Sequence, residues 1–171
     1  MIMFKKFTAV ILVLIIVLSF SGCSYIAYKD YYTKKDYLNI WELEGVRYDA
    51  EGISPLFPES IEDLDVQEFF CRHDQQLPLG EGIQIFLKIH YDTDLFVSEK
   101  ERISSITEEC TDSFNNPDFT AYSTQICNEG VSEYVLINNE DQTILYIYLQ
   151  DIPKKEIELD HKLMPKEYEQ E

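Results

Sequence analysis

Cysteine is the residue type whose chemistry this sequence constrains most. There are four of them, Cys23, Cys71, Cys110 and Cys127. Cys23 follows a long apolar run, and the other three can form at most one disulfide and must leave one thiol over. Cys110 lies near the end of a predicted helix and Cys127 near the end of a predicted strand. We therefore favour a Cys110–Cys127 disulfide among the three pairings, with buried free thiols as the alternative.

Metal binding finds little support in the residue spacing. Cys71 and His73 are separated by a single residue, which is tighter than the usual spacing of zinc ligands. Asp92 and Asp94 lack the glycine and the distal glutamate of a calcium-binding loop. We therefore expect no metal site and no cofactor.

Patterns for nucleophilic catalysis are equally lacking. The chain contains no Gly-x-Ser-x-Gly and no glycine-rich phosphate loop. Acidic residues are so numerous that two carboxylates would meet by chance in almost any cleft, so such a pair says little about glycosidase chemistry. We expect no catalytic residue. A small carboxylate-dependent hydrolase or cell-wall-modifying enzyme is the alternative to a non-catalytic binding module.

The apolar run before Cys23 has the layout of a secretion signal. Two lysines, Lys5 and Lys6, precede an apolar stretch from Phe7 to Phe20. A stretch of about 14 residues is long enough for a signal-peptide core but shorter than a membrane-spanning helix requires. A basic flank followed by an apolar core is typical of a segment that enters the secretion machinery with its basic end inside the cell.

The end of this run, Phe20-Ser21-Gly22-Cys23, resembles the lipobox of bacterial lipoproteins, except that leucine is usual at the position of Phe20. The resemblance implies that residues 1–22 are a signal peptide and that Cys23 becomes a lipidated N-terminus. The lipid would be a thioether-linked diacylglycerol, with a third, palmitate-like chain on the amine in many species. Two or three acyl chains anchor a protein stably, whereas one does not. A plain secretory peptide and an uncleaved spanning anchor are the alternatives.

The composition also suggests the type of organism and the cellular location. Alanine and glycine are scarce while isoleucine, tyrosine, asparagine and glutamate are plentiful, which resembles proteins of low-GC Gram-positive bacteria. The chain is similar to the small lipoproteins of such organisms, whose activities are not known. The resemblance implies a cell-membrane location, lipid-anchored on the extracytoplasmic face.

The charge of the chain excludes several partners. Its 14 lysines and arginines face 32 acidic residues, for a net charge of −18, and loss of Lys5 and Lys6 with the signal peptide leaves about −20. Nucleic acid requires basic patches, so it is not expected as a partner. Anionic lipid heads would repel the body of the protein. Solubility is the simplest interpretation of the charge, with cation binding or partner steering as the alternative.

The segment after the signal peptide divides into three parts. Residues 23–39 are rich in tyrosine and lysine and are predicted to form a lipidated N-terminus and a partly helical stalk. Residues 40–153 are predicted to form one domain, which begins with an extended strap that contains Trp41 and several prolines. Residues 154–171 are predicted to be a charged C-terminal tail.

Alternation of apolar and polar residues predicts the strands of this domain. A helix is predicted between the second and third strands, capped by Thr93 or Asp94, with Phe96, Ile103 and Ile106 facing the sheet. The order ββαβββ gives an α+β fold, mainly an antiparallel sheet of about five strands with one helix packed on one face. The predicted strands are 67–74, 83–91, 119–128, 132–138 and 143–150.

The last of these strands has two apolar faces. Leu145, Ile147 and Leu149 alternate with Tyr146 and Tyr148, so one face is core and the other is aromatic. An exposed aromatic surface usually marks a contact site. The candidate interaction face therefore contains Trp41, Tyr134, Tyr146 and Tyr148, and would hold a protein partner, a peptide or a wall glycan.

Overall fold

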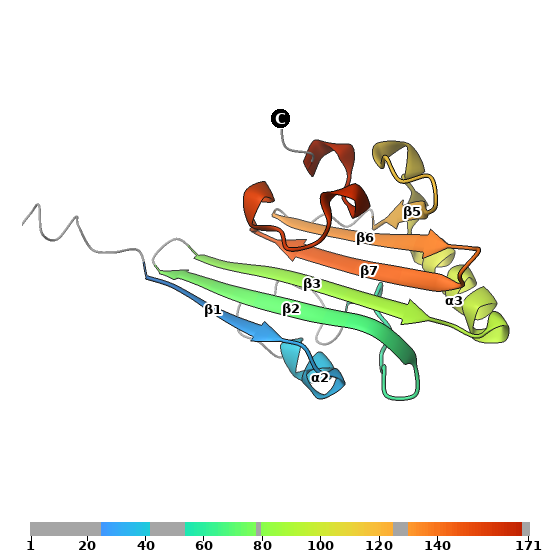
Figure 1. The fold of residues 1–171 in the computed structure, drawn as a ribbon, viewed down its shortest axis with the longest axis horizontal. Helices are drawn as coiled ribbons and strands as arrows, with labels where there is room; N and C mark the ends of the chain where they lie inside the picture. The colour runs from blue at the N-terminus through green and yellow to red at the C-terminus, as the bar shows by residue number, and fades with distance from the viewer. Residues whose placement is uncertain (1–24, 42–53, 78–79, 125–129, 169–171) are drawn as a thin grey trace, which may run out of the picture.

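The centre of the molecule is one antiparallel sheet of seven strands (Figure 1). The computed structural model describes residues 25–41, 54–77, 80–124 and 130–168. The predicted α+β class and mainly antiparallel sheet are confirmed, whereas the five-strand count and the order ββαβββ are wrong. The strands lie in the order β1-β2-β3-β7-β6-β5-β4. They are β1 (Tyr25–Tyr31), β2 (Asp65–Leu77), β3 (Gly80–His90), β4 (Glu108–Glu109), β5 (Thr120–Ser123), β6 (Val131–Asn138) and β7 (Thr143–Gln150).

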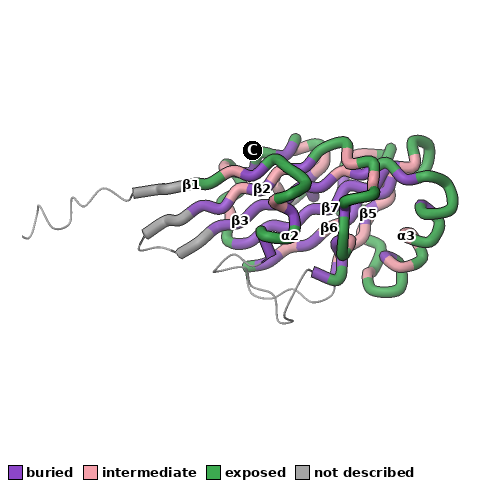
Figure 2. The backbone as a smooth tube through the Cα atoms, turned by 90° about the horizontal axis from the view of Figure 1, so that it is seen from below, coloured by how far each residue is buried: buried purple, intermediate pink, exposed green. Residues whose placement is uncertain are grey.

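The predicted strands form where the alternation of apolar and polar residues in the sequence is clearest. In β3, Ile83, Ile85, Leu87 and Ile89 are fully buried on one face, while Phe86 is buried on the other. Strand β7 is buried along its whole length, which explains why its two faces are both apolar. Figure 2 shows that burial runs along β3, β6 and β7.

The two additional strands lie at opposite edges of the sheet. Strand β1 falls in the predicted stalk and pairs with β2 from Tyr25↔Leu77 to Tyr31↔Cys71. The stalk prediction is therefore wrong for these residues, because cross-strand hydrogen bonds to β2 fix them in an extended form. Helical structure begins only after β1, in the 3-10 turn η1 (Lys34–Asp36) and the short helix α2 (Tyr37–Ile40). Strand β4, of two residues, follows the long helix and pairs with β5.

One face of the sheet is covered by α2, the described part of the strap and helix α3 (Thr93–Ile106). Helix α3 begins after Asp92, whose side chain accepts a hydrogen bond from the backbone N–H of Leu95. Phe96 and Ile103 are buried as predicted, but Ile106 is 40% exposed because it is the last helical residue. No helix in the described part of the chain has the length and apolarity needed to cross a bilayer.

The opposite face is also covered, which the prediction of a single covering helix did not include. The predicted charged tail folds back over β6 and β7 as three short 3-10 turns, visible in red in Figure 1. Ile157, Leu159 and Met164 of this segment are buried against Leu136 and Leu145 of the sheet. The sheet is thus the middle layer between two apolar cores.

Candidate functional site

The predicted interaction face is not an open surface. Tyr146 and Tyr148 are fully buried, and Trp41 is only 8% exposed. The ring of Trp41 packs edge-on against Tyr148 at 5.8 Å, and Phe57 of the strap packs against Tyr146 at 5.5 Å. The prediction is wrong because the strap supplies its own aromatic side chains to cover the tyrosines.

Tyr134 does not share a face with these residues. It is paired in register with Ile147, whose side chain belongs to the core on the opposite side of the sheet. Its ring contacts Phe114 at 5.6 Å, and its side chain is half-buried. The four residues of the predicted face are therefore divided between the two sides of the sheet.

The hydroxyl groups of the buried tyrosines serve a structural network. The hydroxyls of Tyr91 and Tyr146 lie 2.8 Å apart, and Tyr146 donates to Glu99 Oε1 of helix α3 at 2.5 Å. Arg102 donates to Glu99 at 2.5 Å and to the backbone oxygen of Leu56 at 2.8 Å. Burial raises the pKa of both tyrosines above its usual value, so both stay protonated. The network joins helix, sheet and strap.

A different aromatic surface is open to solvent. Tyr28 is 64% exposed and Tyr32 is 62% exposed, and they lie on either side of Asp30. Phe70 and Arg72 of β2 lie beside them on the same face of the sheet. We call Tyr28, Asp30, Tyr32, Phe70 and Arg72 the β1–β2 surface. The sequence shows that this segment is rich in tyrosine, but a stalk was predicted. That prediction did not consider that residues two apart, such as Tyr28 and Asp30, would lie on the same face of a strand.

Arg72 holds the β1–β2 surface together. Its Nε and Nη2 donate to the two carboxylate oxygens of Asp30 at 2.7 and 2.9 Å, and Nη1 donates to Glu158 of the C-terminal segment. Its guanidinium lies 4.9 Å from the ring centroid of Tyr28 and 5.5 Å from that of Phe70. The hydrogen bonds from Arg72 hold the pKa of Asp30 below its usual range. A bidentate arginine pair of this kind fixes its neighbours in orientation.

Stacked rings extend this surface toward the core. Tyr32 packs against Phe70 at 5.6 Å, and Phe70 stacks on the buried Phe86 at 5.7 Å with the rings 11° apart. Tyr32 also donates to Asp30 Oδ2 at 3.1 Å.

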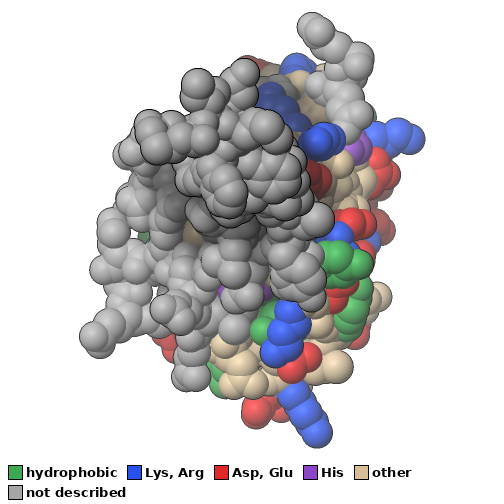
Figure 3. Space-filling model, turned by 90° about the vertical axis from the view of Figure 1, so that its left-hand side faces the viewer, with side chains coloured by type: hydrophobic (Ala, Val, Ile, Leu, Met, Phe, Trp, Pro, Cys, Tyr) green, Lys and Arg blue, Asp and Glu red, His purple; other side chains and the backbone are tan. Residues whose placement is uncertain are grey.

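Seen from the end where β1 begins, acidic and basic side chains lie next to one another over the described surface (Figure 3).

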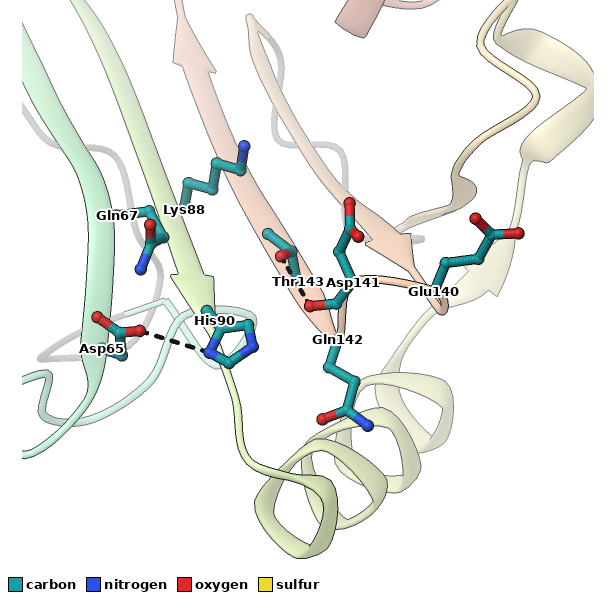
Figure 4. Close-up of a pocket in the computed structure, with 8 residues that line it drawn as sticks. All are labelled: Asp65, Gln67, Lys88, His90, Glu140, Asp141, Gln142 and Thr143. Carbon is teal, nitrogen blue, oxygen red and sulfur yellow. Dashed lines mark hydrogen bonds and ion pairs between the residues drawn. The ribbon is translucent and has the colours of Figure 1, made fainter.

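A polar hollow of about 570 Å³ lies where β2 begins and β3 ends, beside the turn between β6 and β7 (Figure 4). His90 Nδ1 is 3.4 Å from Asp65 Oδ2 across the first two strands. Glu140 points away from the other labelled side chains, and Gln142 points toward helix α3. The lining residues are Asp65, Gln67, Lys88, His90, Glu140, Asp141, Gln142 and Thr143.

One carboxyl group is buried under the strap. Glu133 Oε1 accepts a hydrogen bond from Ser54 at 2.5 Å, and Oε2 accepts one from Thr124 at 3.2 Å. Burial raises the pKa of Glu133 above its usual value, and the two hydroxyl donors only partly offset this effect. Both of its oxygens are engaged within the protein, so Glu133 attaches the strap to β6.

Replacing Glu133 with glutamine should make the free energy of unfolding less dependent on pH. Because folding raises the pKa of this carboxyl, its ionisation destabilises the native state, and the wild type gains stability as pH falls through the raised pKa toward 4.5. We expect the free energy of unfolding of Glu133→Gln, relative to that of wild type, to be highest at pH 7–8 and to fall toward pH 4.5. Urea unfolding at a series of pH values measures the difference.

The exposed substitution Glu62→Gln is the control for Glu133→Gln, since it removes the same charge from an open position. The difference in the free energy of unfolding between Glu62→Gln and wild type should vary little over that pH range. A Glu133→Gln difference that stayed constant with pH would show that the burial of this carboxyl does not affect its ionisation.

The cysteines that the structure describes are not arranged for catalysis. Cys71 and Cys110, the two cysteines among the described residues, are not bonded to each other. Burial raises the pKa of Cys71 to about 12, which keeps it as the unreactive thiol. Cys23 and Cys127 lie outside the described residues, so lipidation and the Cys110–Cys127 disulfide stay predictions. Among the described residues, no three His, Cys, Asp or Glu side chains form a group that could hold a metal ion.

No protein-family model, curated protein or solved structure matches this chain. Its function must therefore be inferred from its own side chains, and the β1–β2 surface and the polar hollow are two places in the described part of the chain where they are open to a ligand.

Proposed function

We propose that this protein is a lipid-anchored, non-catalytic module that binds a neutral wall polysaccharide on the β1–β2 surface. The observation that carries the proposal is the exposure of Tyr28 and Tyr32 beside an arginine whose three nitrogens each donate to a carboxylate. Large, exposed aromatic side chains and arginine are the residues that most often dominate binding energy. Because Arg72 lies against the ring of Tyr28, and Tyr32 is held by Phe70 and Asp30, little conformational entropy is lost when a ligand binds.

The chemistry of the surface favours a sugar polymer over a peptide. Sugar rings have apolar C–H faces that stack on aromatic rings, and hydroxyl rims that hydrogen-bond to groups such as Asp30 and Glu158. An apolar side chain of a peptide would require an apolar pocket, whereas the β1–β2 surface combines its rings with the charged groups of Asp30 and Arg72. The net charge of −18 also disfavours anionic polymers.

The proposed location at the membrane depends on Cys23 and its lipid. Strand β1 begins at Tyr25, two residues after that cysteine, so an acylated Cys23 would hold the sheet directly at the membrane without an intervening stalk. The β1–β2 surface would then lie close to the membrane, and the polar hollow at the far ends of β2 and β3 would face away from it (Figure 1).

The alternative function, a carboxylate-dependent hydrolase, has weaker support. It requires two acids that converge in a pocket partly shielded from water. In the polar hollow, Asp65, Glu140 and Asp141 are all exposed. The buried Glu133 has both oxygens engaged by Ser54 and Thr124. Neither the polar hollow nor the surroundings of Glu133 therefore provide such a pair.

Combined Tyr28→Ala and Tyr32→Ala substitutions test the polysaccharide proposal. We expect the affinity for insoluble wall glycan, stripped of its anionic polymers, to fall at least about tenfold, because each stacked aromatic contributes about 1 kcal/mol or more. Co-sedimentation of the purified chain, from residue 24 onward, with the glycan measures this affinity.

The matched control replaces Leu95 and Val97 with alanine, since these apolar side chains are about equally exposed on helix α3. This pair should leave glycan binding unchanged. Equal binding by wild type and the tyrosine variant, with both folded by circular dichroism, would refute the proposed surface. Binding that appears only when the anionic polymers are retained would refute the proposed ligand class.

A further inference from the structure

The polar hollow contains a cation, Lys88, that has no partner among the described residues. Lys88 is half-buried on β3, and within the described residues its ammonium group makes no hydrogen bond or ion pair. Its cross-strand neighbour Glu68 does not pair with it, although the two are in register. In a chain with 32 acids and only 14 bases, an unpaired and partly desolvated lysine is a site where an anionic group would be stabilised.

The same hollow is lined by carboxylates that, within the described part of the chain, have no lysine or arginine partner. Asp141 Oδ2 accepts a hydrogen bond only from the neutral amide of Asn138, at 3.3 Å, among the described residues. Asp65 is exposed and contacts His90 through Oδ2 at 3.4 Å. Figure 4 shows Lys88 extending between β3 and β7, with Asp141 at the turn end and Asp65 on the opposite strand. The hollow therefore presents both signs of charge, separated across the strands.

The register sets the spacing of the backbone positions that carry these charges. His90 lies opposite both Asp65 on β2 and Thr143 on β7, so the hollow spans three neighbouring strands and is about 10 Å wide. Lys88 is two residues inward from His90, which places its backbone about 7 Å from the rim. An extended dipeptide separates its terminal charges by a similar length, about 7 Å. The volume of about 570 Å³ is in the range of small-ligand sites.

We propose that this hollow binds a short zwitterionic peptide, with its terminal carboxylate on Lys88 and its terminal ammonium group between Asp65 and Asp141. A divalent cation fits the hollow less well, because the described residues offer no group of three metal ligands and Lys88 would repel the ion. A purely anionic ligand would be repelled by the carboxylates on both walls. The site is separate from the β1–β2 surface and does not depend on polysaccharide binding there.

The test uses the purified chain from residue 24 onward and three probes: alanyl-alanine, its N-acetyl derivative and its C-terminal amide. We expect the free dipeptide to bind and each blocked derivative to bind about tenfold more weakly, because each loses one charge-assisted hydrogen bond. Lys88→Met should weaken the free dipeptide about tenfold and should make binding insensitive to amidation. Asp141→Asn should instead reduce the effect of acetylation. Isothermal titration calorimetry measures all of these affinities.

Lys162→Met, in the exposed C-terminal segment, is the matched control and should bind the dipeptide as wild type does. Binding of all three probes with equal affinity, or no binding at millimolar concentration by a folded wild type, would overturn the proposal. The Tyr28→Ala, Tyr32→Ala variant should retain dipeptide binding, and Lys88→Met should retain glycan binding. Each site can therefore fail without the other.

Discussion

Replacing Trp41 with alanine is expected to lower the free energy of unfolding by about 3–5 kcal/mol. The indole ring packs edge-on against Tyr37 at 6.4 Å, Phe57 at 5.1 Å and Tyr148 at 5.8 Å. It is the point where α2, the strap and β7 meet, so the cavity left by alanine would lie between three elements. Urea unfolding followed by far-UV circular dichroism measures the loss, since the chain has no other tryptophan.

Leu38→Ala is the control for Trp41→Ala, because Leu38 lies on the same helix and is 48% exposed. We expect it to change stability by no more than about 0.5 kcal/mol. If Trp41 were instead part of an open binding face, Trp41→Ala would resemble Leu38→Ala in stability and would alter only binding. That result would contradict the burial described above.

Replacing Cys23 with serine is expected to abolish acylation of the protein. Under the lipid-anchor proposal the wild type is cleaved before Cys23 and incorporates labelled palmitate, whereas Cys23→Ser incorporates none. The membrane affinity lost is large, since acyl chains contribute about 0.8 kcal/mol for each buried methylene. Metabolic labelling and the mass of the mature N-terminal peptide measure both events.

A second variant separates the lipid from the signal peptide, because an uncleaved Cys23→Ser chain could be retained by its own apolar segment. In this variant residues 24–171 follow an ordinary cleavable secretory leader. We expect it to appear in the medium, folded and unlabelled. If it remained with the membranes in the same amount as wild type, a protein contact rather than a lipid would be the anchor. Undiminished labelling of Cys23→Ser would also exclude the proposed lipidation site.

The parts of the fold that could be predicted are those with a strong local pattern. Strands β3, β6 and β7 and helix α3 were found because their side chains alternate or repeat over many residues. The turn between β6 and β7 was found because Asn, Glu and Asp lie between two apolar runs. These features need no knowledge of distant contacts.

The remaining elements depend on contacts that the sequence does not reveal. Strand β1 is held by its pairing with β2, more than 40 positions away in the sequence, as the bond from Arg72 to Asp30 shows. The burial of Tyr146 and Tyr148 depends on a strap whose local pattern, rich in proline and glycine, gives no register. The candidate face was therefore assigned to the wrong tyrosines, because strand periodicity identifies two apolar faces but not what covers them.

The position of β1 determines how the domain would respond to mechanical load. If a lipid holds the chain just before Tyr25 while a ligand is pulled at the far ends of β2 and β3, the force acts along the strands. The seven residue pairs from Tyr25↔Leu77 to Tyr31↔Cys71 are then loaded together in shear rather than opened one after another. An edge strand that is weak when peeled sideways is strong in this direction, so the tethered domain would resist extension by the ligand it holds.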